Sequence, residues 1–199
     1  SYKRIILAKK NMDLFDSYET KWNDVVNTVG IYNNRKLASK IAQESITLVK
    51  NNNLPFDPNK YKKVTHILLS TDNDLRSRLK SFARDIRYIH GNVNEIYVND
   101  PLTKLGKQDV INKLGDSDIV IVSMLIRISM DKGLSTIHET HNELLSQLRQ
   151  LKIPIIGISF GSPYLPSYDV LDSYLCSYGY GSVTLDATTD ALFGRKNIT

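Results

Sequence analysis

From about Lys63 onward, apolar runs of strand length alternate with segments of helical periodicity. This alternation is typical of βαβ units, which build a parallel sheet with helices on both faces. The expected strands are residues 64–69, 95–98, 119–125, 153–160 and 174–178. Three of them are almost continuous Val, Ile and Leu, as in strands that are buried on both faces. The sequence therefore predicts a flavodoxin-like three-layer α/β/α sandwich with a mostly parallel sheet of about five or six strands.

Two of the intervening segments carry apolar stripes at helical spacing. The stripes are Leu75, Leu79, Phe82 and Ile86 in one segment, and Ile137, Leu144, Leu148 and Leu151 in the other. Asp72 is placed to cap the first helix, and Thr136 with Glu139 has the spacing of a capping box for the second. A last helix is expected between Ser182 and Gly194.

The residues before this alternating region have a different character. Helical stretches are expected at 3–11 and 20–29, followed by a longer helix at 33–50. Three asparagines and then Pro55 follow this helix, and a proline prevents its continuation. We therefore divide the chain into a helical linker segment, residues 1–32, and an α/β domain, residues 33–199.

Composition narrows the possible partners. The chain has 199 residues, enough for one good core, and its 26 basic residues are spread along the chain instead of forming one block. Despite a net charge of +5, this distribution argues against a nucleic-acid partner. No stretch approaches the roughly 18 to 20 apolar residues of a membrane span. The single cysteine, Cys176, has no partner for an internal disulfide and lies in an apolar run, so we expect a buried thiol.

The predicted strands are not followed by phosphate-binding loops. No Gly-x-Gly-x-x-Gly motif is present, and the first strand leads into Ser-Thr-Asp-Asn-Asp (70–74), whose carboxylates would repel a phosphate. We therefore expect no cofactor. A free-standing flavodoxin-like module that binds a nucleotide or another ligand remains the alternative for this fold class.

Several motifs resemble, in the same order, those of the C-terminal domain of family 3 glycoside hydrolases. The motifs are KIAQESITLVKNNNLPF at 40–56, FGSPY at 160–164, DSYLCSY at 172–178 and ALFG at 191–194. The opening segment, Arg4 to Lys9 with Leu14 and Phe15, is similar to the one that closes the catalytic barrel in this family. The resemblance covers nearly the whole chain.

The resemblance implies a full-length enzyme with an N-terminal (β/α)8 barrel that hydrolyses β-linked sugars with retention of configuration. In this family the barrel carries the aspartate nucleophile. The resemblance therefore implies that the barrel is the partner of this domain, that the substrate is a carbohydrate, and that the domain alone is inactive. The family's usual location is extracytoplasmic.

The acid/base of the β-glucosidase branch is a glutamate on the loop after the third strand of this domain. The corresponding loop here, residues 127–136, contains no glutamate, and Asp131 is its only carboxylate. Asp131 is either a solvated loop residue or the replacement for that glutamate. Glu139 is expected to be committed to the capping box. The missing glutamate favours the branch of β-N-acetylhexosaminidases, whose acid/base lies on a barrel loop.

Ser162 and Tyr164 are candidates for substrate binding because the FGSPY motif follows a buried strand, where ligands bind in open α/β sheets. A tight turn that packs Tyr164 is the alternative interpretation. His138 and His141 have a spacing that could bring two imidazoles to a metal ion. However, His141 falls on an apolar stripe and no third ligand is evident, so we expect no metal.

Basic residues lie near one face of the helix after the first strand. They are Arg76, Lys80, Arg84 and Arg87. A solvated helix face explains them, and a surface for a phosphate or an acidic partner is the second interpretation.

Overall fold

The computed structural model describes residues 1–15, 19–70, 76–99, 101–128 and 135–196. The chain divides into two compact units, Ser1–Ala38 and Ser39–Thr199. The first unit holds helix α1 (Tyr2–Asn11), helix α2 (Trp22–Thr28) and the first half of helix α3 (Tyr32–Ser45). No residue of α1 or α2 is buried. None of the described helices is long and apolar enough to cross a membrane.

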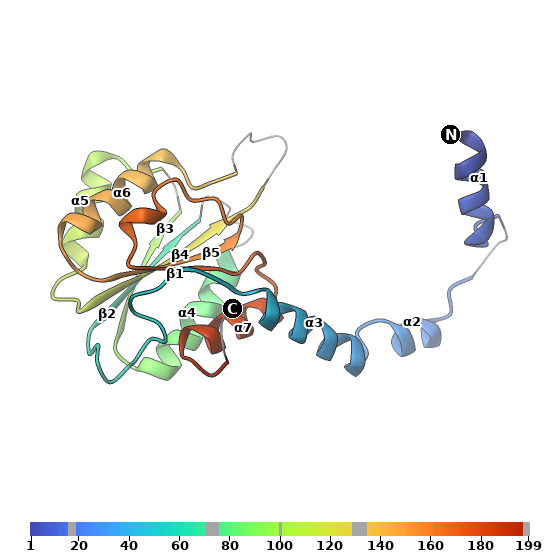
Figure 1. Ribbon diagram of the computed structural model, residues 1–199, viewed down its shortest axis with the longest axis horizontal. Coiled ribbons are helices and arrows are strands. Elements are labelled where there is room, and N and C mark those ends of the chain that lie inside the picture. The colour runs from blue at the N-terminus through green and yellow to red at the C-terminus, as the bar shows by residue number, and fades with distance from the viewer. Residues whose placement is uncertain (16–18, 71–75, 100, 129–134, 197–199) are drawn as a thin grey trace. The chain divides into compact units, whose positions relative to one another are not determined.

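The second unit is built around a six-stranded sheet in the order β1-β6-β5-β4-β2-β3 (Figure 1). Its strands are β1 (Thr47–Lys50), β2 (Val64–Leu69), β3 (Val93–Val98), β4 (Ile119–Ile126), β5 (Ile155–Gly161) and β6 (Ser173–Cys176). Strands β2 to β6 pair in parallel, and β1 pairs antiparallel with β6. Every residue of β2 and β4 is buried. The predicted α/β sandwich with a mostly parallel sheet is therefore confirmed.

Helices cover both faces of this sheet (Figure 1). Helix α4 (Arg76–His90) and helix α7 (Ser182–Leu192) pack on one face, and α5 (Lys104–Lys113) and α6 (Glu139–Gln150) pack on the other. Three residues of the predicted α4 stripe, Leu79, Phe82 and Ile86, are each at most 1% exposed, and the fourth, Leu75, lies outside the described residues. Buried Leu144 and Leu148 likewise anchor α6, whereas Leu151, just past its end, is 41% exposed.

The expected long helix at 33–50 is wrong at its C-terminal end. Helix α3 stops at Ser45, and residues Thr47–Lys50 form strand β1. Thr47 pairs with Cys176 and Leu48 with Leu175 of β6. Pairing with a strand far away in the sequence overrides the helical periodicity of a short segment that contains β-branched residues.

The capping box expected at Thr136 and Glu139 is also wrong. His138 is the N-cap of α6, and its Nδ1 accepts a hydrogen bond from the backbone N–H of Thr140 at 3.2 Å. Glu139 is therefore the first residue of the helix, where a carboxylate interacts favourably with the helix dipole. At the end of α7, Gly194 adopts a φ of +68°, as expected for a residue that ends a helix. Asp72 lies outside the described residues.

Candidate functional site

The loops that follow the parallel strands meet at the carboxyl edge of the sheet. Open α/β sheets bind ligands at this edge, so it is the first place to look for a site. The described part of the edge comprises residue 70 after β2, residues 99 and 101–103 after β3, 127–128 and 135–138 after β4, 162–167 after β5 and 177–181 after β6. Asp131, the carboxylate singled out from the sequence, lies outside the described residues.

A tightly held turn follows β5. Gly161 has a φ of +89°, and a Cβ atom there would lie 2.2 Å from the carbonyl oxygen of Ile126. Only glycine combines this backbone conformation with so close an approach of two strands. The backbone N–H of Ser162 donates to the same Ile126 oxygen at 3.0 Å, and Tyr174 Oη donates to the carbonyl of Pro163 at 2.7 Å. The turn is thus fixed from both neighbouring strands.

The two candidates on this turn have different environments. Ser162 is 1% exposed, and its hydroxyl donates to the carbonyl oxygen of Ser135, which ties together the loops after β4 and β5. Tyr164 is 68% exposed, although the next residue, Leu165, is buried in the core. Ser162 therefore stabilises the turn, and Tyr164 presents an aromatic ring to the outside from a fixed backbone.

A second tyrosine stands at the end of the neighbouring strand. Tyr178 follows β6 with a φ of +57°, which is rare for a bulky side chain and marks a constrained backbone. Tyr178 is 47% exposed, and its hydroxyl donates a hydrogen bond to Thr47 Oγ1 at 3.2 Å. Ile128, two residues past the end of β4, is 61% exposed. The loops after three neighbouring strands thus each carry an exposed aliphatic or aromatic side chain. Tyr178 belongs to the DSYLCSY motif, but the motif predicts neither its positive φ nor its exposure.

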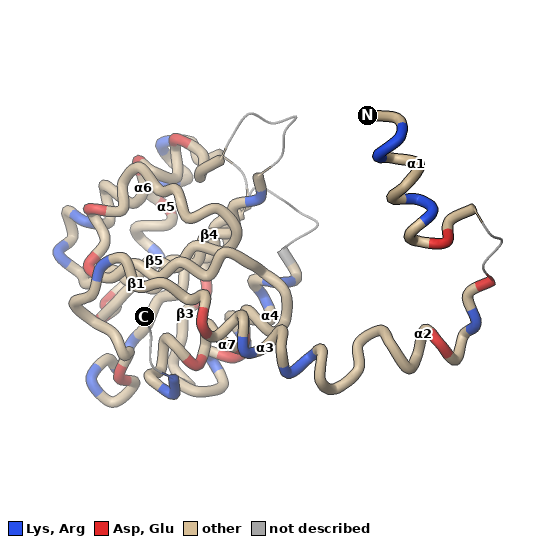
Figure 2. Tube along the Cα trace, turned by 45° about the vertical axis from the view of Figure 1, so that its right-hand side comes forward, with Lys and Arg blue, Asp and Glu red and all other residues tan. Residues whose placement is uncertain are grey.

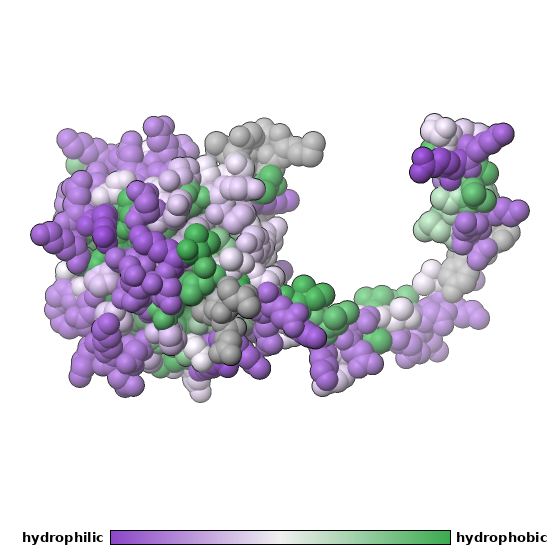
Figure 3. All heavy atoms as spheres, in the orientation of Figure 1, coloured by the Kyte–Doolittle hydropathy of each residue, from purple (hydrophilic) through white to green (hydrophobic). Residues whose placement is uncertain are grey.

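Helix α3 enters the α/β unit at this same edge. Because β1 runs antiparallel to β6, its first residue, Thr47, pairs with Cys176, the last residue of β6. Only Ile46 separates β1 from α3, and Ile46 is 1% exposed. Ile41 on α3 is 58% exposed, and Figure 3 shows hydrophobic residues on the surface of this helix. The polypeptide that precedes β1 is therefore tethered at the edge where a ligand would bind.

The start of α6 lies at the carboxyl edge but does not assemble a metal site. The rings of His138 and His141 are 6.1 Å apart, His138 Nδ1 is engaged by Thr140, and His141 is 1% exposed, as its place on the apolar stripe predicts. Glu139 is exposed because His138 caps the helix in its place. Within the described ranges, no three His, Cys, Asp or Glu side chains gather as metal ligands do.

Three basic side chains of α4 lie close to an acidic or an aromatic group. Arg87 Nη1 lies 2.6 Å from Glu95 Oε1, Arg84 Nε lies 3.4 Å from Asp85, and Lys80 Nζ lies 5.8 Å from the centre of the Tyr97 ring. Figure 2 shows Lys and Arg distributed over the molecule among acidic residues. This arrangement favours the interpretation as a solvated face. The side chain of Arg76 lies outside the described residues.

A groove of about 380 Å³ lies between α4 and α7. Its lining includes Asp85, Asp186 and Asp190, and burial together with the charges of the other two carboxylates raises the pKa of Asp186. The groove lies near the C-terminal half of α4, which runs towards the amino ends of the strands. It therefore does not belong to the carboxyl edge.

The comparisons with known proteins agree with this architecture. No family model matches the sequence, and no curated protein matches it. Among solved structures, a β-glucoside phosphorylase bound to 2FGlc has a TM-score of 0.74 and 20% identity over 96% of this chain and 35% of its own length. A mutant β-glucosidase from Listeria innocua in complex with laminaribiose has a TM-score of 0.74 and 19% identity, covering 98% of this chain and 30% of its own.

A further neighbour is described as a glycoside hydrolase family 3 β-N-acetylglucosaminidase from Paenibacillus sp. str. FPU-7. It has a TM-score of 0.67 and 14% identity over 99% of this chain and 37% of its own length. The chain thus spans only about a third of the length of these three structures. At these identities the likeness establishes a shared fold.

Proposed function

We propose that this chain is the α/β domain of a retaining β-glycosidase of family 3, and that its carboxyl edge borders the active site. One observation carries the proposal: helix α3 joins the sheet at the edge where the exposed Tyr164 and Tyr178 lie. A preceding catalytic barrel tethered by α3 would therefore be held near that edge. The proposal is also supported by the fold, which this chain shares with about a third of the length of two β-glycosidase structures.

In this proposal the barrel supplies the nucleophile and most of the sugar pocket. Ser162 holds the turn after β5, and Tyr164 contacts the substrate with its outward ring. Aromatic rings suit the apolar C–H faces of a sugar, and a tyrosine adds a polar hydroxyl at low cost in side-chain entropy. Neither a cofactor nor a nucleic acid takes part. We place the acid/base on the barrel because the 127–136 loop contains no glutamate.

The absence of that glutamate leads us to propose a β-N-acetylglucosaminidase rather than a β-glucosidase. Structures described as β-N-acetylglucosaminidases and structures described as β-glucosidases both occur among the structural neighbours. The decisive experiment is turnover by the complete polypeptide of nitrophenyl β-N-acetylglucosaminide and nitrophenyl β-glucoside. Faster turnover of the first supports the proposed branch, faster turnover of the second favours the β-glucosidase branch, and turnover of neither contradicts the proposed function.

Residues 1–199 alone should hydrolyse neither nitrophenyl substrate. A retaining glycosidase needs two groups, in the common case carboxyl groups about 5 to 5.5 Å apart, and the proposal places both on the missing barrel. The assay compares the purified chain with a buffer blank, with and without phosphate as an alternative acceptor. Activity that copurifies with the folded chain would contradict the proposal. Tight binding of a flavin or nucleotide would instead support the free-standing flavodoxin-like module.

Asp131 separates the two possible locations of the acid/base. With the acid/base on the barrel, Asp131→Asn in the complete polypeptide should leave kcat within a few-fold of wild type. If Asp131 were the general acid, the change would cost about 10²- to 10⁴-fold. The loss would then be far smaller for an activated nitrophenyl leaving group than for a sugar. Steady-state kinetics with both kinds of substrate decide the question.

A further inference from the structure

Strand β1 contains an irregularity that redirects one side chain. Leu48 pairs with Leu175 and packs on the core beneath α4 and α7, but the register shifts before Lys50, which pairs with Tyr174. Tyr174 belongs to the core on the opposite face. Without the shift, Lys50 would lie two residues beyond Leu48 on the same face. The bulge therefore turns Lys50 to the other face of the sheet, as bulges often do.

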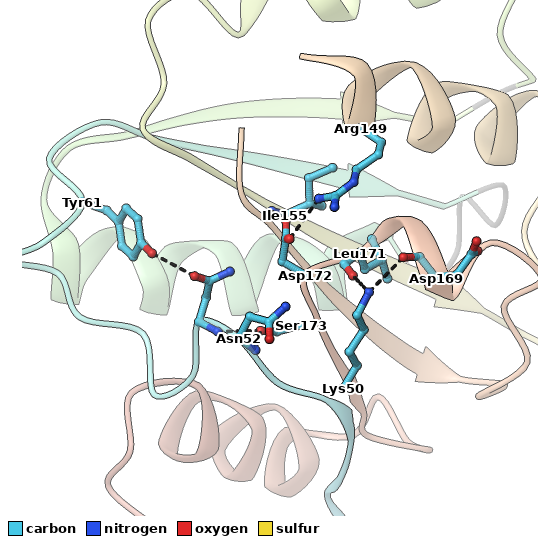
Figure 4. A network of polar contacts seen from close by, with 10 residues as sticks. Lys50, Asn52, Tyr61, Arg149, Ile155, Asp169, Leu171, Asp172 and Ser173 are labelled. Carbon is cyan, nitrogen blue, oxygen red and sulfur yellow. Dashed lines mark hydrogen bonds and ion pairs between the residues drawn. The ribbon is translucent and has the colours of Figure 1, made fainter. Parts of the chain in front are cut away.

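On that face Lys50 reaches the end of the 3-10 turn η2 (Tyr168–Val170). Its Nζ donates to the carbonyl oxygen of Asp169 at 2.9 Å and also to that of Leu171 (Figure 4). Carbonyls at the end of such a turn lack partners within it, and a cation there is favourable. Hydrogen bonds from an ammonium group are stronger than those between neutral groups.

Other contacts fix both sides of this connection (Figure 4). The hydroxyl oxygen of Ser173 accepts hydrogen bonds from the backbone N–H groups of Asn52 and Asn53, at 3.0 and 2.9 Å. Asp172 accepts from the backbone N–H of Ile155 and from Arg149 Nη1, each at 2.9 Å. The η2 turn is thus held by β5 and α6 on one side and by Lys50 on the other.

The segment that Lys50 holds is the one that presents Tyr164. It begins with the turn at Gly161 and ends at Leu171, the second residue that Lys50 contacts. At its other end, Lys50 belongs to a strand that follows α3 after a single buried residue, Ile46. We propose that Lys50 is a positioning residue that couples helix α3 to the segment 161–171. Under the proposed function, this coupling sets Tyr164 relative to the domain that α3 tethers.

Hydrogen exchange of this chain tests the coupling directly. In Lys50→Met, amides of both 46–50 and 165–172 should exchange about tenfold faster or more, because two charge-assisted hydrogen bonds are lost. Strand β4 should keep its protection. Lys50→Arg retains a cation and should stay close to wild type. The matched control is Lys113→Met, which removes a surface lysine paired with Asp109 at 2.6 Å and should leave both segments unchanged.

Three results of this experiment would overturn the proposal. Faster exchange confined to 46–50, or no change at all, would mean that η2 does not depend on Lys50. Equal acceleration in all segments, including β4, would mean that Lys50 contributes only to global stability. None of these readouts depends on the enzymatic assignment.

The consequence for catalysis is tested in the complete polypeptide and rests on the proposed function. Lys50→Met should raise KM for a disaccharide substrate about tenfold with little change in kcat, and Lys50→Arg should restore it. An unchanged KM would show that the coupling does not reach the substrate. A wild-type polypeptide without glycosidase activity would refute the proposed function, whereas the exchange result would still decide the coupling.

Discussion

The free energy of unfolding of this chain should fall as the pH drops from about 6.5 towards 3, and His66 should account for much of the loss. His66 is fully buried in β2, and burial lowers its pKa from 6.5 to about 3. The unfolded chain therefore binds a proton that the folded chain excludes across this window, so stability decreases with falling pH. The two pKa values set an upper estimate of about 5 kcal/mol for this loss near pH 3.

The surroundings of His66 explain why it stays neutral. Its Nε2 forms a hydrogen bond with Ser123 Oγ at 2.8 Å, and its ring meets Phe82 edge-on at 5.9 Å. Nδ1 has no hydrogen-bond partner among the described atoms. A charged imidazole here would need a second acceptor that these apolar neighbours do not offer.

Urea unfolding at several pH values between about 7 and 4 measures this effect. His66→Asn removes the titrating ring and should flatten the dependence on pH, even if the variant is less stable at neutral pH. Ser123→Ala removes the hydrogen-bond partner but keeps the imidazole, so its dependence on pH should remain steep. An equally steep curve for His66→Asn would assign the acid sensitivity to other groups.

The sandwich could be predicted from the sequence because its central strands, β2 and β4, are buried on both faces. Ile119 to Ile126 has an apolar character that few other environments require, and the α4 stripe of Leu79, Phe82 and Ile86 has an unbroken helical spacing. Local pattern and tertiary burial agree in these segments. Patterns of this kind specify the fold class without any knowledge of pairing.

The edge strand β1 was harder to predict, because its conformation depends on pairing with a strand far away in the sequence. Thr47 to Lys50 continue the periodicity of α3, and only their pairing with β6 makes them a strand. In the same way, Thr136 and Glu139 have the spacing of a capping box, yet His138 caps α6. For β1 the deciding contacts are remote in sequence, whereas the cap of α6 is a local contact between His138 and Thr140.

In the candidate site, the position of the turn could be predicted from the sequence, but the exposure of its side chains could not. The FGSPY motif located the turn after β5, but the sequence could not tell that Ser162 is buried and that Tyr164 points outward. That difference depends on Ser135 and Tyr174, which lie on other elements. Tyr178 lies within the DSYLCSY motif, but nothing in a single sequence marks a tyrosine with a positive φ.

Gly161→Ala should be among the most damaging small substitutions in the chain. The added Cβ would lie 2.2 Å from the Ile126 carbonyl oxygen, at a φ of +89°. That oxygen also accepts the N–H of Ser162, so it cannot move away without breaking the contact between β4 and the turn. We expect a loss of about 2 to 4 kcal/mol in the free energy of unfolding. The turn that carries Tyr164 should shift as well.

Gly91→Ala is a matched control for the backbone term. Gly91 has a φ of +82°, close to that of Gly161, but an added Cβ would meet no atom within 4 Å. The control should therefore cost only about 1 kcal/mol, the price of a left-handed alanine. Urea unfolding of both variants separates conformational strain from steric clash. Equal losses would show that the approach of Ile126 to the turn relaxes freely, in which case Tyr164 would not be held by a fixed backbone. A larger loss for Gly161→Ala, with faster exchange of amides 162–165, would show that the close contact between β4 and the turn is what holds Tyr164 at the carboxyl edge.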